Sequence, residues 1–291
     1  MRLFQAQHHD VVGTVHTRTP RDARIAAACV KCDLLDEHAF AALCAAQRPD
    51  VVVHCAAERK PEVCDSDEAA TIALNVAVTK RVALAAKEAR AWLIYLSTDY
   101  VFDGEHPPYS ASSKPNPLSL YGRSKLMGEV AAREVLPFCA VLRVGVLYGG
   151  DQESLDESAV TGLLKTARAS VGASAPVAVD NWGARYPLHV DDVAAVIHSL
   201  CTRHQTFQGF FGTFHLCGKQ RVTKFEMAQL FARLDGIEAS ANLAPNNSEP
   251  SGAKRPKDAR LDCRALQLMD CLSRRKLEDG FAQVVSAFPR N

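Results

Sequence analysis

The stretch DVVVHCAA (residues 50–57) decides the fold, because it is an apolar run of strand length with little polar alternation. A strand of that kind is buried on both faces, as in a parallel sheet. Four more runs of this character are VVGTVH (11–16), ACVKCD (28–33), AWLIYLS (91–97) and AVLRVGVLY (140–148). Helical patterns lie between them, over residues 37–47, 68–88 and 120–135. The alternation predicts a parallel sheet covered by helices on both faces.

This order of elements indicates an α/β protein with a Rossmann-like, doubly wound parallel sheet. Beyond residue 150 the alternation of apolar strands and helices becomes less regular. Helices are expected near residues 158–169, 190–204 and 223–234, with the short strands PVAVD (176–180) and GTFHL (212–216) between them. We therefore expect a Rossmann-like domain over residues 1–150 and a smaller α/β lobe over residues 151–291, interleaved with the first.

Composition excludes several classes of function. The chain has 291 residues and a formal net charge of +1, so neither a nucleic-acid partner nor an anionic membrane surface is expected. The sequence has no run of about 18 apolar residues, so no membrane span is expected. The N-terminal segment MRLFQAQHHDVV lacks the basic-then-apolar order of a signal peptide.

The ten cysteines stand singly within apolar runs, which is typical of buried free thiols. Free thiols indicate a reducing compartment, so we expect a cytoplasmic protein, with the nucleus as a second location. Cys29 and Cys32 form one C-x-x-C motif. A zinc site needs a second pair of ligands at suitable spacing, and the sequence offers none, so core packing is the preferred interpretation and no metal is expected.

A candidate catalytic set follows the strand AWLIYLS. Thr98 lies where this strand ends, and Tyr121 and Lys125 open the next helix four residues apart. Ligands of an open α/β sheet bind outside the carboxyl ends of its strands. Thr98 would hold a substrate oxygen and Tyr121 would protonate it, while Lys125 would lower the pKa of Tyr121 and grip a nicotinamide ribose. The alternative is a solvated helix face, on which Y-x-x-x-K occurs by chance.

Two motifs around this set, STDYVFDG (97–104) and PLSLYGRSKLMGE (117–129), resemble the dTDP-4-dehydrorhamnose reductase branch of the extended short-chain dehydrogenases/reductases. Five other stretches are similar to the regulatory beta subunits of methionine adenosyltransferases: VVVHCAAERKPEVCD (51–65), LDESAVTGLL (155–164), NWGARYPLHVDDVA (181–194), GTFHLCGKQRVTKFEMA (212–228) and AKRPKDARLDC (253–263). The resemblance covers essentially the whole chain. It implies an NADP-binding, reductase-like regulatory protein that associates with the catalytic subunit making S-adenosylmethionine.

The same resemblance implies positions for the cofactor. His16, Thr17 and Arg18 follow the strand VVGTVH, where the family contacts the adenosine ribose. Arg18 offers two parallel donors to a 2′-phosphate, which favours NADP over NAD, although a solvated loop arginine is the alternative. Further matching positions are Asp33 and Leu34 on the adenine side, Cys55 and Arg59 after the strand VVVHC, and Leu147 on the nicotinamide side.

The glycine-rich turn of a dinucleotide fold is missing. None of the sixteen glycines forms a G-x-x-G-x-x-G motif, and VVGTVH matches the second strand of the family. The first strand is central in the order 3-2-1-4-5. We therefore expect the sheet to split into a 3-2 pair and a 4-5-6 group, with weakened NADP binding, and we interpret the sequence as a fragmentary gene model or a shortened isoform.

Some polar residues leave two interpretations open. Asn75, within an apolar helix, would join a proton relay or cap a buried carbonyl. Arg185 and His189 would face a sugar nucleotide in a reductase, or belong to the start of a helix, where the dipole favours Asp191 and Asp192. The leading hypothesis for function is the regulatory subunit. An NADPH-dependent sugar-nucleotide reductase of the dTDP-4-dehydrorhamnose type is the first alternative, and an inactive fragment is the second.

Overall fold

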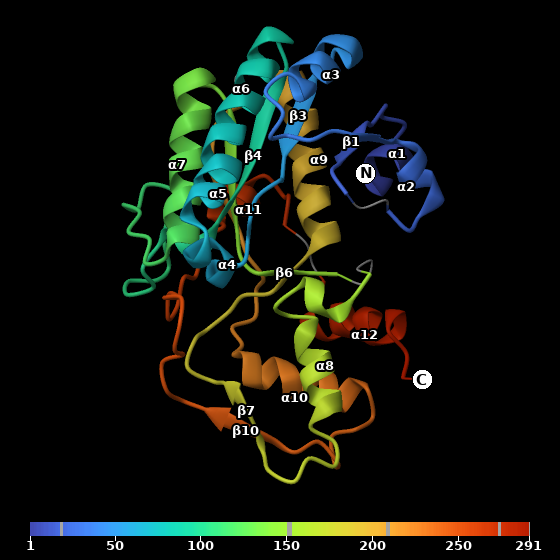
Figure 1. Cartoon of the computed structure of the whole chain (residues 1–291), viewed down its shortest axis with the longest axis vertical. Helices are drawn as coiled ribbons and strands as arrows, with labels where there is room; N and C mark the ends of the chain where they lie inside the picture. The colour runs from blue at the N-terminus through green and yellow to red at the C-terminus, as the bar shows by residue number, and fades with distance from the viewer. Residues whose placement is uncertain (18–19, 150–152, 208–209, 273–274, 291) are drawn as a thin grey trace. The chain divides into compact units, whose positions relative to one another are not determined.

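The computed structural model describes residues 1–17, 20–149, 153–207, 210–272 and 275–290. The chain forms two compact units, each built from three segments (Figure 1). Unit 1 comprises Met1–Val101, Ser119–Arg143 and Ala194–Phe214. Unit 2 comprises Phe102–Leu118, Val144–Val193 and His215–Asn291.

The main sheet has four strands in the order β3-β4-β5-β9, with bounds Val51–His54, Trp92–Thr98, Ala140–Val144 and Gly212–Leu216. β3 and β4 pair in parallel, with Val51 opposite Trp92 and His54 opposite Tyr95. Every residue of β5 and six of the seven in β4 are buried. The apolar runs that predicted these strands are therefore explained by burial on both faces. The prediction of an α/β parallel sheet with flanking helices is confirmed.

A second sheet of unit 1 contains only β1 (Gly13–Val15) and β2 (Cys29–Lys31), paired in parallel with Gly13 opposite Cys29. Within the described part of the chain, no strand joins β1 to β3. The predicted division of the sheet into a strand pair and a second group is therefore confirmed, although the second group has four strands instead of three because β9 joins it. Its effect is visible in the side chains, because neither β1 nor β2 contains a buried residue.

Helices cover the main sheet of unit 1. Figure 1 shows α3 (Ala39–Gln47), α6 (Val78–Glu88) and α7 (Leu120–Val135) side by side along β3 and β4. α6 contacts both α3 and α7. The core between helices and strands contains Val78, Val82, Leu93, Tyr95 and Val141. The helices of this unit are α1 (Arg2–Ala6), α2 (Ala23–Ala27), α3 (Ala39–Gln47), α4 (Pro61–Ser66), α5 (Glu68–Ile72), α6 (Val78–Glu88) and α7 (Leu120–Val135). α9 (Val190–Phe207) begins in unit 2, and its residues from Ala194 onward belong to unit 1.

The helix predicted over residues 68–88 is continuous but contains a π-helical turn, η1 (Ala73–Ala77), between α5 and α6. Asp67 caps its start by accepting a hydrogen bond from the Ala70 amide. The span Glu68–Glu88 is long and apolar enough to cross a membrane by length and composition alone. Its buried face, which includes Val78 and Val82, packs in the core of unit 1, and a core helix reaches the same hydropathy.

Unit 2 is built from two parallel strand pairs and three main helices. The pairs are β6 (Leu147–Tyr148) with β8 (Leu188–His189), and β7 (Val177–Asp180) with β10 (Leu243–Asn246). The helices are α8 (Gly162–Ala169), α10 (Lys224–Leu234) and α12 (Leu277–Ala287), with the short α11 (Arg264–Leu268). A capping box of Thr223 and Glu226 starts α10. The rings of Phe231 and Phe281 stack in the core with centroids 4.0 Å apart.

Two strand predictions differ from the structure. The run AVLRVGVLY is two strands, because β5 belongs to the main sheet whereas β6 pairs with β8 in unit 2. The segment GTFHL was expected among the short strands of the second lobe. It forms β9, which is hydrogen-bonded to β5 in the main sheet. Periodicity identifies a strand but does not identify its neighbour, which depends on residues far away in the sequence.

Candidate functional site

The candidate catalytic set lies in unit 1, where β4 ends and α7 begins. Thr98 is the last residue of β4 and is buried. Ser119 caps α7 by accepting a hydrogen bond from the Gly122 amide at 3.2 Å, which fixes the first turn carrying Tyr121. Lys125 follows one turn later on the same helix. The structure thus brings Thr98, Tyr121 and Lys125 together at the carboxyl end of a central strand.

Tyr121 is half-buried and stands edge-on to Tyr100, with ring centroids 5.7 Å apart. Removal from water raises the pKa of the Tyr121 phenol well above its ordinary value, and the negative charge of Asp99 acts in the same direction. A hydrogen bond with Thr98 opposes this shift. The expectation that the Tyr-Lys pair lowers the pKa of Tyr121 is therefore wrong for this structure. The phenol is protonated at neutral pH.

The ammonium of Lys125 has a different neighbour. Its Nζ lies 4.2 Å from the centroid of the Tyr95 ring, in cation–π geometry, and the side chain is only 3% exposed. Burial lowers the pKa of Lys125 to about 8, although Cys55 and Glu129 act in the opposite direction. Tyr95 was not predicted as part of the site. The sequence feature that could have indicated its role is that a single tyrosine stands inside the apolar run AWLIYLS.

A buried ion pair lies beneath the set. Arg143 of β5 donates to Glu129 of α7, with Nη2 2.7 Å from Oε2 and Nε 2.8 Å from Oε1. Ser97 donates to Glu129 at 2.6 Å, so the carboxylate bridges both strands to the helix. Sequence reasoning missed Glu129, although it stands four residues after Lys125 and therefore on the same helix face. These bonds fix α7 against β4 and β5.

Asn75 has a role in positioning the backbone. Its amide nitrogen donates to the Glu58 carbonyl at 3.0 Å and to Ser124 at 2.9 Å, and its oxygen accepts from the Glu58 amide at 2.8 Å. The π-helical turn η1 thus holds the segment after β3 and the first turns of α7. Gly128 permits this approach, because a Cβ there would lie 2.7 Å from the Asn75 carbonyl oxygen and would also collide with the Tyr95 hydroxyl. Of the two interpretations, the structure favours capping of buried backbone groups.

The residues implied for the adenine side gather at the end of the β1–β2 pair. His16 follows β1 and Asp33 follows β2, with His16 Nε2 3.7 Å from Asp33 Oδ2, and both side chains are exposed. The Leu34 carbonyl accepts from Arg81 at 3.2 Å. Thr17 is exposed next to His16. Arg18 lies outside the described residues.

The remaining cofactor positions lie on other elements. Cys55 and Arg59 are exposed on the segment that follows β3, and the Arg59 amide donates to the Glu58 carboxylate at 2.8 Å. Leu147 belongs to unit 2, where its carbonyl accepts from Ser158 at 2.7 Å. The structure therefore assembles the adenine-side residues and the Thr-Tyr-Lys set in unit 1, and places Leu147 in the other unit.

The polar residues of the second lobe have structural partners. His189 is buried, and its Nδ1 accepts from the Asp191 amide at 3.1 Å, which is a cap at the start of α9. Asp192 pairs with Arg275 at 3.2 Å. Arg185 is buried and donates to the Ala184 carbonyl at 2.7 Å. These contacts favour the helix-start interpretation for His189 and the aspartates.

The chain is similar along most of its length to known proteins. Residues 1–289 match the model of the RmlD substrate binding domain. The chain is 40% identical to methionine adenosyltransferase 2 subunit beta of Mus musculus over 257 residues, which are 88% of this chain and 75% of that protein. A solved dTDP-4-dehydrorhamnose reductase from Clostridium acetobutylicum is 25% identical with a TM-score of 0.77, covering 89% of each chain. That of Bacillus anthracis, in complex with NADP, is 23% identical with a TM-score of 0.76, covering 89% of this chain and 88% of the other.

Proposed function

Because this chain belongs to the RmlD substrate-binding family and, within it, to the group of methionine adenosyltransferase 2 beta subunits, we propose that it is a regulatory subunit of a methionine adenosyltransferase. The observation that carries this proposal is the extent of the similarity, 40% identity over 257 residues. That span covers 88% of the chain and so includes parts of both units. A likeness confined to the nucleotide-binding fold would support no particular partner. The proposed partner is the catalytic subunit that makes S-adenosylmethionine.

The cofactor proposed for this subunit is NADP. The donor set in unit 1 suits the nicotinamide ribose, since it combines the hydroxyls of Thr98 and Tyr121 with the ammonium of Lys125. His16, Thr17 and Asp33 are the polar groups proposed for the adenosine side. When bound, NADPH supplies a hydride.

The chain's own residues favour binding over proton transfer. The phenol of Tyr121 is held protonated by burial, and its pKa lies far above neutrality. A general acid is most efficient when its pKa is near the working pH. The ammonium group of Lys125 lies over the aromatic ring of Tyr95. Tyr121 can therefore donate a hydrogen bond to a ligand oxygen, and Lys125 can bind a ribose hydroxyl, while complete proton transfer from Tyr121 is unfavourable.

The test is co-purification with a methionine adenosyltransferase catalytic subunit, followed by assays of S-adenosylmethionine synthesis with and without this chain. We expect a stable complex with altered kinetics. The Tyr121→Phe variant is the matched control, because it removes one hydroxyl and should form the complex as well as the parent. Folded protein that forms no complex would contradict the proposal. Circular dichroism and size-exclusion chromatography establish folding beforehand.

An NADPH-dependent sugar-nucleotide reductase is the second candidate, favoured by the position of Thr98 at the end of β4 and of Tyr121 and Lys125 in the first turns of α7. Its test is oxidation of NADPH in the presence of a dTDP-4-keto-deoxysugar. If this reading is right, Tyr121→Phe should lower the rate by about 10²–10⁴-fold. A background rate equal in parent and variant would exclude it. A cytoplasmic or nuclear location is proposed for either function, since all ten cysteines are free thiols.

A further inference from the structure

Two thiols meet in unit 2 outside the candidate site. Cys217 and Cys263 are 46 residues apart in the sequence, and their Sγ atoms lie 3.7 Å from each other. Both thiols also share one acceptor, the Leu261 carbonyl, at 3.5 and 3.6 Å. Both side chains are half-buried, so neither sulfur is sealed in a core. A disulfide needs an S–S separation of about 2.05 Å, which small side-chain rotations can supply when the backbones are already adjacent.

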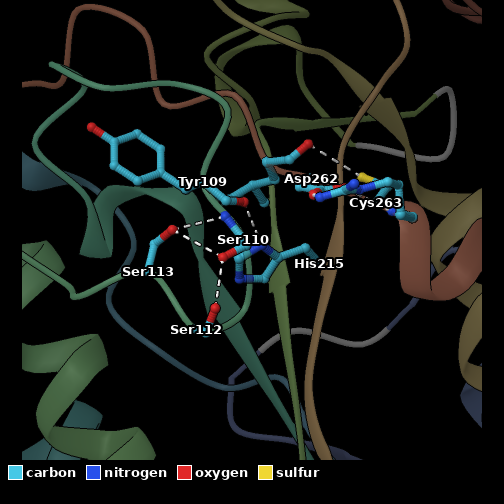
Figure 2. Close-up of polar contacts among 9 residues, drawn as sticks. Tyr109, Ser110, Ser112, Ser113, His215, Asp262 and Cys263 are labelled. Atoms are coloured by element: carbon cyan, nitrogen blue, oxygen red, sulfur yellow. Dashed lines mark hydrogen bonds and ion pairs between the residues drawn. The ribbon is translucent and has the colours of Figure 1, made fainter.

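The Tyr109 carbonyl group connects the two chain segments that carry this pair. Figure 2 shows Tyr109, His215, Asp262 and Cys263 in one group. His215 Nδ1 lies 3.0 Å from the Tyr109 carbonyl oxygen, and the Asp262 amide donates to the same oxygen at 2.7 Å. Cys217 follows His215 by two residues, and Cys263 follows Asp262 directly. The proximity of the two sulfurs is therefore fixed by hydrogen bonds on both sides.

The pair also differs chemically from the buried cysteines. A hydrogen bond from Cys217 lowers the pKa of Cys263 below its ordinary value, and the charge of Arg260 acts in the same direction. Burial instead raises the pKa of Cys44, Cys139 and Cys201. The thiolate is the reactive form of cysteine, so oxidants select the thiols that ionise most readily.

We propose that Cys217 and Cys263 are a redox modification site that forms a reversible intramolecular disulfide with a low-molecular-weight disulfide as oxidant. The Cys263 thiolate attacks one sulfur of the oxidant, forming a mixed disulfide and releasing one small thiolate. The Cys217 thiolate then attacks the Cys263 sulfur and releases the second. Two protein thiols lose two protons and two electrons, and the small disulfide is reduced to two thiols. Disulfides of this kind in reducing compartments are transient and redox-sensing.

The experiment treats the full chain with oxidised glutathione, alkylates the remaining thiols and maps the peptides by mass spectrometry. We expect a crosslinked peptide pair lighter by two hydrogen atoms than the sum of its parts, and its loss after dithiothreitol. The proposal does not depend on a partner subunit or on NADP. Recovery of Cys217 and Cys263 as alkylated thiols, while the exposed Cys55 carries glutathione, would overturn it.

Variants sharpen the result. Cys217→Ser should stop the reaction at a glutathione adduct on Cys263, whereas Cys29→Ser, which changes another half-buried thiol, should leave the crosslink unchanged. Equal crosslinking in Cys217→Ser would contradict the assignment. Because the peptide map of the unaltered protein already decides whether the bond forms, the proposal stays testable if a serine variant fails to fold. The disulfide should also raise the thermal unfolding temperature, since it closes a long loop.

Discussion

The two sheets of unit 1 are built from similar apolar runs and end in different environments. β4 and β5 are buried on both faces, with Leu93 and Leu142 fully enclosed. β1 and β2 contain no buried residue, and Val30 of β2 is 41% exposed. The difference follows from neighbours, because β4 lies between β3 and β5 whereas β1 pairs only with β2 in the described residues. Apolar sequence makes a strand, but a neighbouring strand and helices are needed to bury it.

The same contrast appears in two side-chain pairs of unit 1. The Arg143–Glu129 pair is buried in the β4–β5 region, at 4% and 1% exposure. The His16–Asp33 pair beside β1 and β2 is 62% and 49% exposed. Water screens the attraction within the exposed pair. In the buried pair each charge has lost its hydrating water, so each needs the partner charge to offset that loss.

The largest expected effect comes from breaking the buried pair. Glu129→Gln keeps the shape but leaves the Arg143 charge without its carboxylate, which should lower the free energy of unfolding by about 3–5 kcal/mol. Asp33→Asn is the matched control at the exposed pair and should cost less than about 1 kcal/mol. Urea denaturation of the three proteins measures both. Equal losses would show that the two regions do not differ in dielectric environment.

Removing apolar volume should give the next largest difference. Leu142→Ala in β5 creates a cavity and should cost about 2–5 kcal/mol. Val30→Ala in β2 removes a half-solvated side chain and should change stability by only about 0.5 kcal/mol. The midpoint of urea unfolding reports both changes. A large loss at Val30 would mean that β2 is covered in solution.

A smaller, pH-dependent effect belongs to Lys125. Its pKa falls from 10.5 unfolded to about 8 folded, so the folded state binds fewer protons between those values and the contribution of Lys125 to stability rises with pH there. Burial raises the pKa of Cys44, Cys139 and Cys201, and their contribution falls as pH rises above 9. The Lys125 effect is therefore read from the difference between the parent and a lysine variant. Over pH 8–10 the gain should be about 2–3 kcal/mol, from 1.36 kcal/mol per pKa unit. Burial raises the pKa of Tyr95 and Tyr121, whose contribution is lost only above pH 10.

The measurement compares unfolding free energies of the parent and of Lys125→Met across that range. The advantage of the parent over the variant should grow by about 2–3 kcal/mol from pH 8 to pH 10, because the variant has no proton to release. Lys31→Met, an exposed lysine of β2, is the control and should follow the parent across the range. A constant difference between the parent and Lys125→Met from pH 8 to pH 10 would show that the Lys125 ammonium is better solvated than its burial implies.

Much of the fold could be predicted from the sequence. The helix over residues 120–135 coincides with α7, and the strand AWLIYLS differs from β4 by one residue at each end. The missing glycine-rich motif predicted that the sheet would divide, and β1–β2 stands apart from β3–β4–β5–β9. The meeting of Thr98, Tyr121 and Lys125 was also predictable, because strand ends and the helices that follow them are adjacent in an open α/β sheet.

The sequence by itself therefore determined the order of the main strands and helices up to residue 148, the division of the sheet and the grouping of the Thr-Tyr-Lys set. These features depend on side-chain periodicity and on connections between consecutive elements. Tertiary structure decided that Lys125 faces Tyr95, that burial raises the pKa of Tyr121, that β9 joins β5, and that Cys217 meets Cys263. Each of these depends on desolvation or on contacts between residues 30 or more positions apart, which no local pattern encodes.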